Sequence, residues 1–350
     1  MKGAMLTRSG NRTHIWDFYR SIGVNVDAAL SNAGLPIDVE MHPDSLISHH
    51  RVLGASDFLH RREPIQDRGW HIYSSQQLYG VSSKAERFIR SQVGLYGKLR
   101  ALAGCVATAG NMCRVHFENT GDAIRLYATD RKPIRRNEED QLFSDWARVF
   151  PIINAARLQL GDKWRPRKIG FRARRQCCDE AADHFRSTEM HFGETSVWVE
   201  FPCDLLVQEA WAAPCGSAAE IQVAADFKDV NMPNFSSVAD MLRHMFPAYL
   251  SQGCPSLDEM AEILGLSRRT LQRQLLQENA TFSGLFSEVR LRYATELLAD
   301  GQIKIIDIAV AMGFEHPAHF TRAFRRQTGL SPRAYRRSLD TNEAQKAAAI

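Results

Sequence analysis

The sequence lacks any long apolar run. No stretch approaches the ~20 consecutive apolar residues that a helix needs to cross a bilayer, and the N-terminal segment has no apolar core of the kind found in secretory signals. These absences predict a protein that stays in the cytoplasm and has no membrane partner.

Cysteine pairs with the C-x-x-C spacing are missing as well. The seven cysteines are scattered through the 350 residues, and none forms the C-x-x-C pair that is typical of zinc sites and thiol redox centres. The simpler interpretation is a set of reduced thiols without a metal or redox role. Cys177 and Cys178 are adjacent, but neighbouring cysteines rarely form a disulfide, so the pair is given no function.

Motifs of common enzymes are also absent. There is no glycine-rich phosphate loop, no G-x-S-x-G and no H-E-x-x-H. His184 and His191 lie seven residues apart near acidic residues and could be considered for a metal site. Histidines beside acidic residues are, however, common on polar surfaces. We therefore expect no catalytic residues, no metal and no cofactor.

Neither sign of charge is in large excess. The 44 basic and 40 acidic residues give a net charge of +4, which by itself does not indicate nucleic acid. The distribution is more informative, because the stretch from His316 to Arg337 has no carboxylate. Such a basic surface attracts phosphates, although a charged run is often only a solvated face. Its six arginines are Arg322, Arg325, Arg326, Arg333, Arg336 and Arg337.

The length allows two domains, since single domains usually run ~100–200 residues. Helical patterns over 15–33, 83–109 and 137–160 accompany a hairpin pattern over 113–127, whereas the C-terminal region shows only helical patterns. We therefore predict an α+β protein, in which a mixed α/β domain precedes an all-α domain. The predicted segments are a disordered N-terminus over 1–12, the first domain over 13–213, a linker over 214–237, the second domain over 238–338 and a flexible tail over 339–350.

Two stretches of the C-terminal region, 260–275 and 308–324, share one construction. Ala261 matches Ala309, and Gly265 matches Gly313. A small alanine lets two helices approach closely, and a glycine four residues later can adopt the positive φ that ends the first helix. Each stretch therefore predicts a helix, a turn and a second helix.

The second helix of each unit has an inner and an outer face. Leu271 and Leu275 match Phe320 and Phe324, and each pair lies one turn apart, so these residues should anchor the helix to the core. The opposite faces combine arginine with glutamine or threonine, and arginine and glutamine pair bidentately with guanine and adenine edges in the major groove. The outward residues are Arg269, Gln272, Arg273 and Leu276 in the first unit, and Ala318, Thr321, Arg322 and Arg325 in the second.

The segment between the two units, 281–299, has the pattern of a capped helix with apolar residues along one side. At ~1.5 Å per residue it would span ~28 Å, and successive major-groove faces lie ~34 Å apart. One chain could therefore place both outward faces in neighbouring major grooves of a DNA duplex.

Residues 256–336 resemble the DNA-binding domain of the AraC/XylS family of bacterial regulators. The second unit carries the family signature in Ile308-Ala309, Gly313-Phe314, the FTRAF run over 320–324, Gly329 and the SPRAYR run over 331–336; His316-Pro317 departs from it somewhat. The resemblance implies base contacts by Arg269, Gln272, Arg273, Thr321 and Arg322. Arg273 and Arg322 could equally clamp phosphates. Phosphate contacts are expected from Arg268, Arg325, Arg326, Arg333, Arg336 and Arg337.

The first domain resembles, more weakly, the effector-binding domain of the ornithine-regulator branch of this family. The similar segments are Gly34-Leu35-Pro36, Pro43-Asp44, Ile47-Ser48, 164–171 and Phe192-Gly193. The resemblance implies a sensor for a small organic effector. Glu200 or Asp145 could pair with a cationic ligand. The aromatic residues Trp70, Tyr73, Trp146, Phe150 and Trp198 could line its pocket or be ordinary core.

These observations predict an effector-responsive transcription regulator that binds double-stranded promoter DNA. The resemblance implies an activator that recruits RNA polymerase, and a homodimer formed through the first domain. Two alternatives stay open. One is an enzyme domain fused to a DNA-targeting module, and the other is a ligand-independent activator whose first domain only dimerises.

Overall fold

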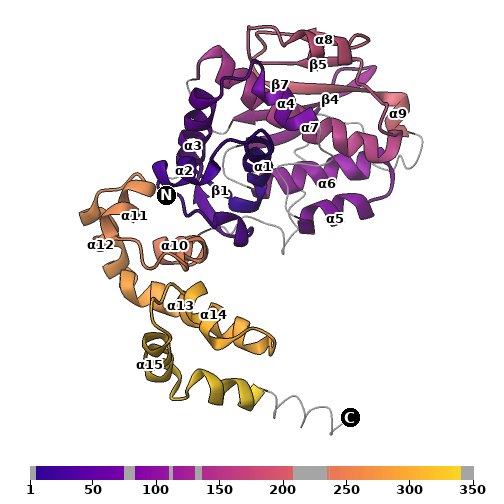
Figure 1. Ribbon diagram of the computed structural model, residues 1–350. Coiled ribbons are helices and arrows are strands. Elements are labelled where there is room, and N and C mark those ends of the chain that lie inside the picture. The colour runs from indigo at the N-terminus through magenta and orange to yellow at the C-terminus, as the bar shows by residue number, and fades with distance from the viewer. Residues whose placement is uncertain are drawn as a thin grey trace, which may run out of the picture. The chain divides into compact units, whose positions relative to one another are not determined.

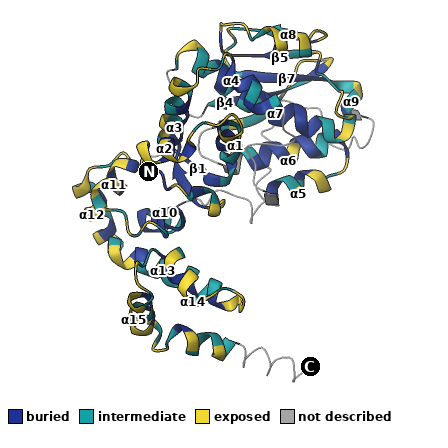
Figure 2. Ribbon diagram, in the orientation of Figure 1, coloured by how far each residue is buried: buried dark blue, intermediate teal, exposed yellow. Residues whose placement is uncertain are grey.

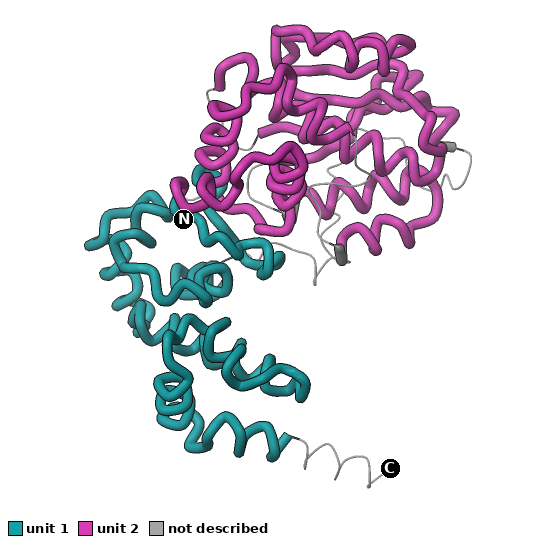
Figure 3. The backbone as a smooth tube through the Cα atoms, viewed as in Figure 1, with its two compact units in different colours: residues 1–4, 34–51, 234–350 teal, residues 5–33, 52–233 magenta. Residues whose placement is uncertain are grey.

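The computed structural model describes residues 5–74, 83–109, 113–130, 136–207, 235 and 237–339 (Figure 1). The chain divides into two compact units (Figure 3). The N-terminal unit contains residues 5–33 and those from 52 to 207, and the C-terminal unit contains residues 34–51 and those from 235 onward. Residues 214–234 and 236 of the predicted linker and 340–350 of the predicted tail lie outside the described residues.

The N-terminal unit is built on a five-stranded sheet with the order β3-β4-β7-β5-β6. β5 and β6 are parallel, and the other neighbouring strands are antiparallel. The predicted hairpin is confirmed as β3 and β4, whose register pairs Asn119 with Ile124. Its turn is tight because Gly121 has a φ of +102° and its N–H donates to the Asn119 side chain at 2.8 Å. The strands are β3 (Cys113–Asn119), β4 (Ala123–Asp130), β5 (Lys168–Gly170), β6 (Glu189–His191) and β7 (Val197–Pro202).

Helices cover the sheet, and the longest of them is α7 (Glu138–Leu160), which packs against α4, α6 and β7. The helical patterns over 15–33 and 83–109 each form two helices rather than one. The breaks occur where Gly23 and Gly94 adopt φ values of +82° and +68°, which end a helix. The other helices are α1 (Thr13–Ser21), α2 (Val26–Asn32), α3 (His49–Arg62), α4 (Arg68–Ser74), α5 (Ser83–Ser91), α6 (Gly94–Ala109), α8 (Asp179–His184) and α9 (Cys203–Val207).

Residues 1–12 were expected to be disordered, and the described part of this segment is not. Leu6–Arg8 form the short strand β1, and Ser9–Asn11 form a 3-10 turn. Leu6 is buried, as are Ser9 and Asn11. The segment has too few residues for a periodic pattern, so its burial could not be predicted.

The core of the N-terminal unit is aromatic. The indole of Trp146, on α7, is fully buried and lies 5.7 Å from the ring of Trp70, 5.3 Å from Phe150 and 4.8 Å from Phe171. Its Nε1–H donates to Asp67 at 2.8 Å. The indole is thus held by packing on several sides and by one buried hydrogen bond.

His14, near the start of α1, should make this unit sensitive to acid. Burial lowers the pKa of His14 to about 3, and the charge of Arg12 adds to the effect. The unfolded chain takes up a proton near pH 6.5 while the folded chain does not, so stability is lost as the pH falls from 6.5 toward 3. At pH 5 the expected loss is ~2 kcal/mol relative to neutral pH.

Urea unfolding at pH 7 and pH 5 checks this expectation, and His14→Gln should remove most of the difference. An NMR titration that found His14 protonating near pH 6.5 in the folded protein would contradict it.

The C-terminal unit is helical from residue 238 onward, as the sequence predicts. Its helices are α10 (Val238–Met245), the 3-10 helix η4 (Phe246–Tyr249), α11 (Leu257–Ile263), α12 (Arg268–Gln277), α13 (Phe282–Ala299), α14 (Ile305–Ala311), α15 (Pro317–Thr328) and a last helix over 332–339. Glu278, just after α12, accepts the backbone N–H groups of Val238 and Ala239 at 2.9 and 2.8 Å. This carboxylate therefore caps α10, because the first N–H groups of a helix have no partner within it.

Residues 34–51 also belong to the C-terminal unit, although they precede most of the N-terminal unit in sequence. They contain the 3-10 helix η2 (Val39–Met41), which packs against η4, and the strand β2 (Leu46–Ser48), which packs against α10. The ring of His42 lies 6.0 Å from that of Tyr293, and Arg51 forms an ion pair with Glu262 at 3.8 Å. We call residues 34–51 the inserted segment.

Candidate nucleic-acid interface

The first repeat forms the predicted helix, turn and helix. α11 begins with a capping box, in which Ser256 and Glu259 each accept the other's backbone N–H. Gly265 follows the end of α11 and has a φ of +65°, as expected from its position. Ser267 is the N-cap of α12, and its side chain accepts the N–H of Thr270 at 3.2 Å.

The second repeat is formed by α14 and α15. Gly313 lies between them with a φ of +72°, as predicted. A side chain at this position would also collide with backbone, since a Cβ would lie 2.3 Å from the carbonyl oxygen of Leu250 and 2.8 Å from the nitrogen of Gly253. α15 has Pro317 in its first turn and ends at Gly329, whose φ is +79°. Gly313 is thus required both for its conformation and for its lack of a side chain.

The inner faces of the two second helices agree with the prediction. Leu271 is fully buried, and Leu275, Phe320 and Phe324 are each 2% exposed. The small residues that allow the close approach, Ala261 and Ala309, are buried as well. α12 and α15 are therefore anchored along one side, which fixes which side chains face solvent (Figure 2).

The helix between the repeats is α13, and it is capped as predicted, since Thr281 accepts the N–H of Gly284 at 3.1 Å. Leu285 and Val289 of its predicted apolar stripe are buried, whereas Phe282, Tyr293 and Leu297 are half-buried. Arg290, also on α13, has a role that its sequence pattern did not indicate.

The guanidinium of Arg290 stacks on the ring of Phe286 at 4.7 Å and on that of Phe314 at 4.5 Å. Phe314 directly follows the turn glycine of the second repeat, so Arg290 ties α13 to that repeat through cation–π contacts.

The outer faces carry the side chains proposed to read DNA bases. Arg269, Gln272 and Arg273 on α12 are exposed, and so is Arg322 on α15. Thr321 is half-buried, and its hydroxyl donates to the carbonyl of Pro317 at 3.0 Å. The base contacts themselves stay a prediction.

The arginines proposed to contact phosphates differ in their surroundings. Arg325, Arg326, Arg333 and Arg337 are exposed. Arg268 is exposed too and pairs with Asp258 at 2.7 Å. Arg336 is half-buried, and its guanidinium donates to the carbonyls of Leu298 at 3.2 Å and Ile303 at 2.6 Å. Arg336 therefore holds the end of α13, a role that sequence reasoning missed.

The aromatic residues proposed for an effector pocket all lie in the N-terminal unit. Trp70, Trp146 and Phe150 contact one another and Phe185 in the buried core. Tyr73 is 1% exposed. Trp198 is on β7, with the guanidinium of Arg125 over its ring at 4.0 Å. The structure thus brings three of the five proposed residues, Trp70, Trp146 and Phe150, together in one aromatic core.

The two acidic residues considered for a cationic ligand already have partners. Glu200 is bound by Arg125 at 2.9 Å and lies 3.8 Å from Lys168. Asp145 accepts the backbone N–H groups of Arg172 and Ala173, each at 2.8 Å. Both carboxylates are therefore already occupied by donors of the protein itself.

Within the part of the chain that the structure describes, no three His, Cys, Asp or Glu residues are placed to hold a metal ion. No helix among those same residues has the length and apolar character needed to cross a bilayer.

Part of the C-terminal unit is similar to known proteins. Residues 260–338 match the family described as "Helix-turn-helix domain". The chain is 40% identical over 79 residues to the HTH-type transcriptional regulator GlxA of Rhizobium meliloti, covering 22% of this chain and 24% of that protein. It is 37% identical over 82 residues to the Ornithine utilization regulator of Pseudomonas aeruginosa, covering 23% and 24%. It is 39% identical over 84 residues to the HTH-type transcriptional activator RhaS of Escherichia coli, covering 24% and 30%.

These matches are local, because the chain spans only about a quarter of the length of the curated relatives it matches. A solved structure, the transcriptional regulator CdpR from Pseudomonas aeruginosa, aligns over 81% of this chain and 91% of its own, with 19% identity and a TM-score of 0.37.

The matched span contains both helix-turn-helix units with their positive-φ glycines, their buried anchors and their exposed arginines. Residues 260–338 are thus similar to the helix-turn-helix domains of transcription regulators.

Proposed function

We propose that the protein is a sequence-specific, DNA-binding transcription regulator, active in the cytoplasm, whose C-terminal unit reads two adjacent major grooves. The observation that carries the proposal is the pair of matched helices, α12 and α15. Each is anchored by two buried apolar residues, and Arg273 and Arg322 occupy corresponding exposed positions. Exposed arginines on a rigid helix are suited to major-groove contacts.

In this proposal the domain over 13–213 binds a small organic effector and forms the homodimer, and the domain over 238–338 binds promoter DNA and recruits RNA polymerase as an activator. The inserted segment supports a link between effector and DNA. Its residues pack in the C-terminal unit, but both of its ends continue into the N-terminal unit. A ligand that binds two conformations of the N-terminal unit unequally could thereby change the population of DNA-binding conformations.

A series of variants tests α12 and α15, which we call the reading helices. The DNA duplexes that the protein selects from a random-sequence library define the operator sequence. Gel retardation at equilibrium then compares the affinities of the variants for this operator. Arg273→Ala or Arg322→Ala should weaken binding by ~1–3 kcal/mol and relax the preference at one base position, because a bidentate contact to one base is lost.

The matched control is Arg292→Ala, since Arg292 is an exposed arginine on α13, outside both reading helices. Its effect on specificity should be negligible. If Arg273→Ala and Arg322→Ala weaken binding equally on all sequences and lower the salt dependence, the two arginines contact phosphates instead. If the full-length protein selects no preferred sequence, the proposed function is wrong.

A further inference from the structure

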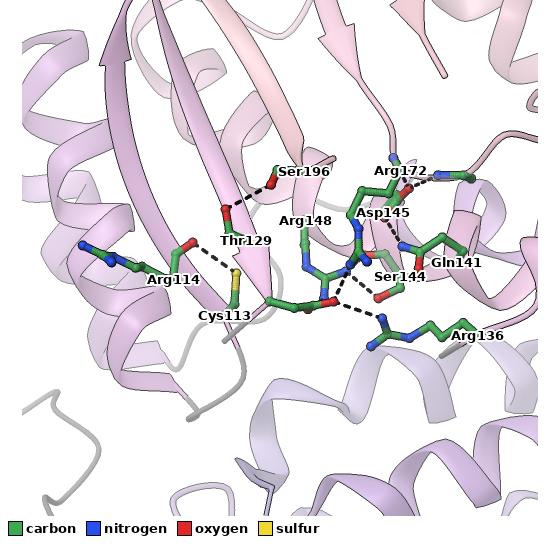
Figure 4. Close-up of polar contacts among 12 residues, drawn as sticks. Cys113, Arg114, Thr129, Arg136, Gln141, Ser144, Asp145, Arg148, Arg172 and Ser196 are labelled. Carbon is green, nitrogen blue, oxygen red and sulfur yellow. Dashed lines mark hydrogen bonds and ion pairs between the residues drawn. The ribbon is translucent and has the colours of Figure 1, made fainter. Parts of the chain in front are cut away.

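The N-terminal unit contains several arginines around one carboxylate, Asp130, at the end of β4. Arg172 donates to it at 2.5 Å and Arg136 at 3.3 Å, and Arg148 donates to its other oxygen. Arg136 precedes α7, Arg148 is on α7 and Arg172 follows β5, and their side chains converge (Figure 4). Arg12, just before α1, interacts electrostatically with Arg148. We call Arg12, Arg136, Arg148 and Arg172 the arginine cluster.

This cluster is buried and has more positive than negative charge. The side chains of Arg136 and Arg148 are 7% and 11% exposed, and that of Asp130 is 5% exposed. Asp145 is the second carboxylate that acts on Arg148. Four guanidinium groups minus two carboxylates leave an excess of two positive charges among the described residues that form the cluster.

The pKa directions of Arg12 and Arg136 agree with this imbalance. Burial lowers the pKa of Arg136, and the neighbouring Arg148 lowers it further. Burial likewise lowers the pKa of Arg12, with Arg148 again adding to the effect. Burial alone would raise the pKa of Asp130, but Arg148, Arg136 and Arg172 outweigh it and hold that pKa below its usual value.

Donor capacity is also left over. The Nε–H of Arg12 is buried and makes no hydrogen bond among the described residues. Tyr73, which is 1% exposed, lies beside Arg12 and also interacts with Arg148. Arg68 faces Tyr73 as well, but it is already balanced by Asp57 and Asp140, at 3.4 and 2.5 Å. Arg148 is compensated, because its interaction with Asp130 above all outweighs burial and raises its pKa. The surplus of charge and donors therefore lies on the side of Arg12.

We propose that the arginine cluster binds a small organic anion through a carboxylate or phosphate group. Uncompensated buried charge is costly, and the planar guanidinium fork matches both oxyanions bidentately. The anion would supply the missing negative charge beside Arg12 and Tyr73. That it is the effector rests on the proposed function above.

Titration calorimetry and thermal unfolding of the full-length protein test the site, with succinate and inorganic phosphate as probes. Succinamide serves as the uncharged analogue, and chloride at equal ionic strength as the salt control. We expect saturable binding and a rise in Tm with concentration for at least one oxyanion, and the better of the two identifies the group that is recognised. Equal shifts with chloride, or no shift with either oxyanion, would overturn the proposal.

Two variants with opposite expected effects sharpen the test. Arg12→Gln removes a donor that forms no ion pair with a described carboxylate, and it should weaken oxyanion binding roughly tenfold or more. Asp130→Asn removes the carboxylate that competes with the ligand, so the thermal shift caused by the oxyanion should become larger than in the wild type. The control is Arg175→Gln, an exposed arginine of the same unit. The proposal fails if Arg12→Gln binds the probe as tightly as Arg175→Gln does.

The same samples separate this inference from the proposed function. Sequence-specific DNA binding without oxyanion binding would refute the anion site and leave the regulator intact. Oxyanion binding without any preferred DNA sequence would refute the regulator and leave the anion site intact.

Discussion

Replacing Gly313 with alanine is expected to abolish the folded second repeat and, with it, specific DNA binding. The residue has a φ of +72°, a conformation that costs an L-residue ~1–2 kcal/mol. In addition, the new Cβ would lie 2.3 Å from the carbonyl oxygen of Leu250, which is backbone and cannot rotate away. We expect a total loss of ~3 kcal/mol or more in the free energy of unfolding of the C-terminal unit.

Gly265→Ala is the matched control, because the first repeat has the same turn. Its φ of +65° imposes a similar backbone cost, but nothing lies within 4 Å of the added Cβ. Urea unfolding should therefore show a loss of only ~1–2 kcal/mol for this variant. Equal losses for the two variants would mean that the close approach of Gly313 to Leu250 does not exist in solution.

Trp146→Ala should destabilise the N-terminal unit by ~3–5 kcal/mol, as expected for a fully buried tryptophan. The substitution empties the middle of the aromatic core and leaves the buried carboxylate of Asp67 without the indole donor at 2.8 Å. Burial raises the pKa of Asp67, whose hydrogen bonds partly offset the effect, so the loss of a donor adds to the cost of the cavity. Urea unfolding of the full-length protein, followed by circular dichroism, measures the effect.

Trp164→Ala provides the comparison, because Trp164 is half-buried and stacks on Phe201 with ring centroids 5.5 Å apart. Its loss should cost clearly less than that of Trp146. If Trp146→Ala instead preserved stability and removed only the response to an effector, Trp146 would line a ligand pocket rather than the core.

The two repeats could be predicted from sequence because their determinants are local. A helix period and a glycine at a turn each act within a few residues, so Gly265 and Gly313 could be assigned roles that the structure confirms. The same holds for the hairpin of β3 and β4, in which a short polar turn joins two alternating segments.

Features that depend on long-range contacts could not be predicted. Arg336 has the appearance of a surface arginine in a basic run, but the carbonyls that it binds are 38 and 33 residues away. The arginine cluster joins residues from four separate places in the chain, and no spacing rule connects Arg12 with Arg148. These side chains come together only when the sheet and α7 are assembled.

The inserted segment has a practical consequence for engineering. A fragment that begins at residue 235 would lack η2 and β2. The parts of η4 and α10 on which these elements pack would then be uncovered. It would also lose Arg51, which forms an ion pair with Glu262 on α11, and His42, whose ring contacts that of Tyr293 on α13. A transplantable version of this DNA-binding module therefore needs two pieces of the natural polypeptide, which a short designed connector would have to join.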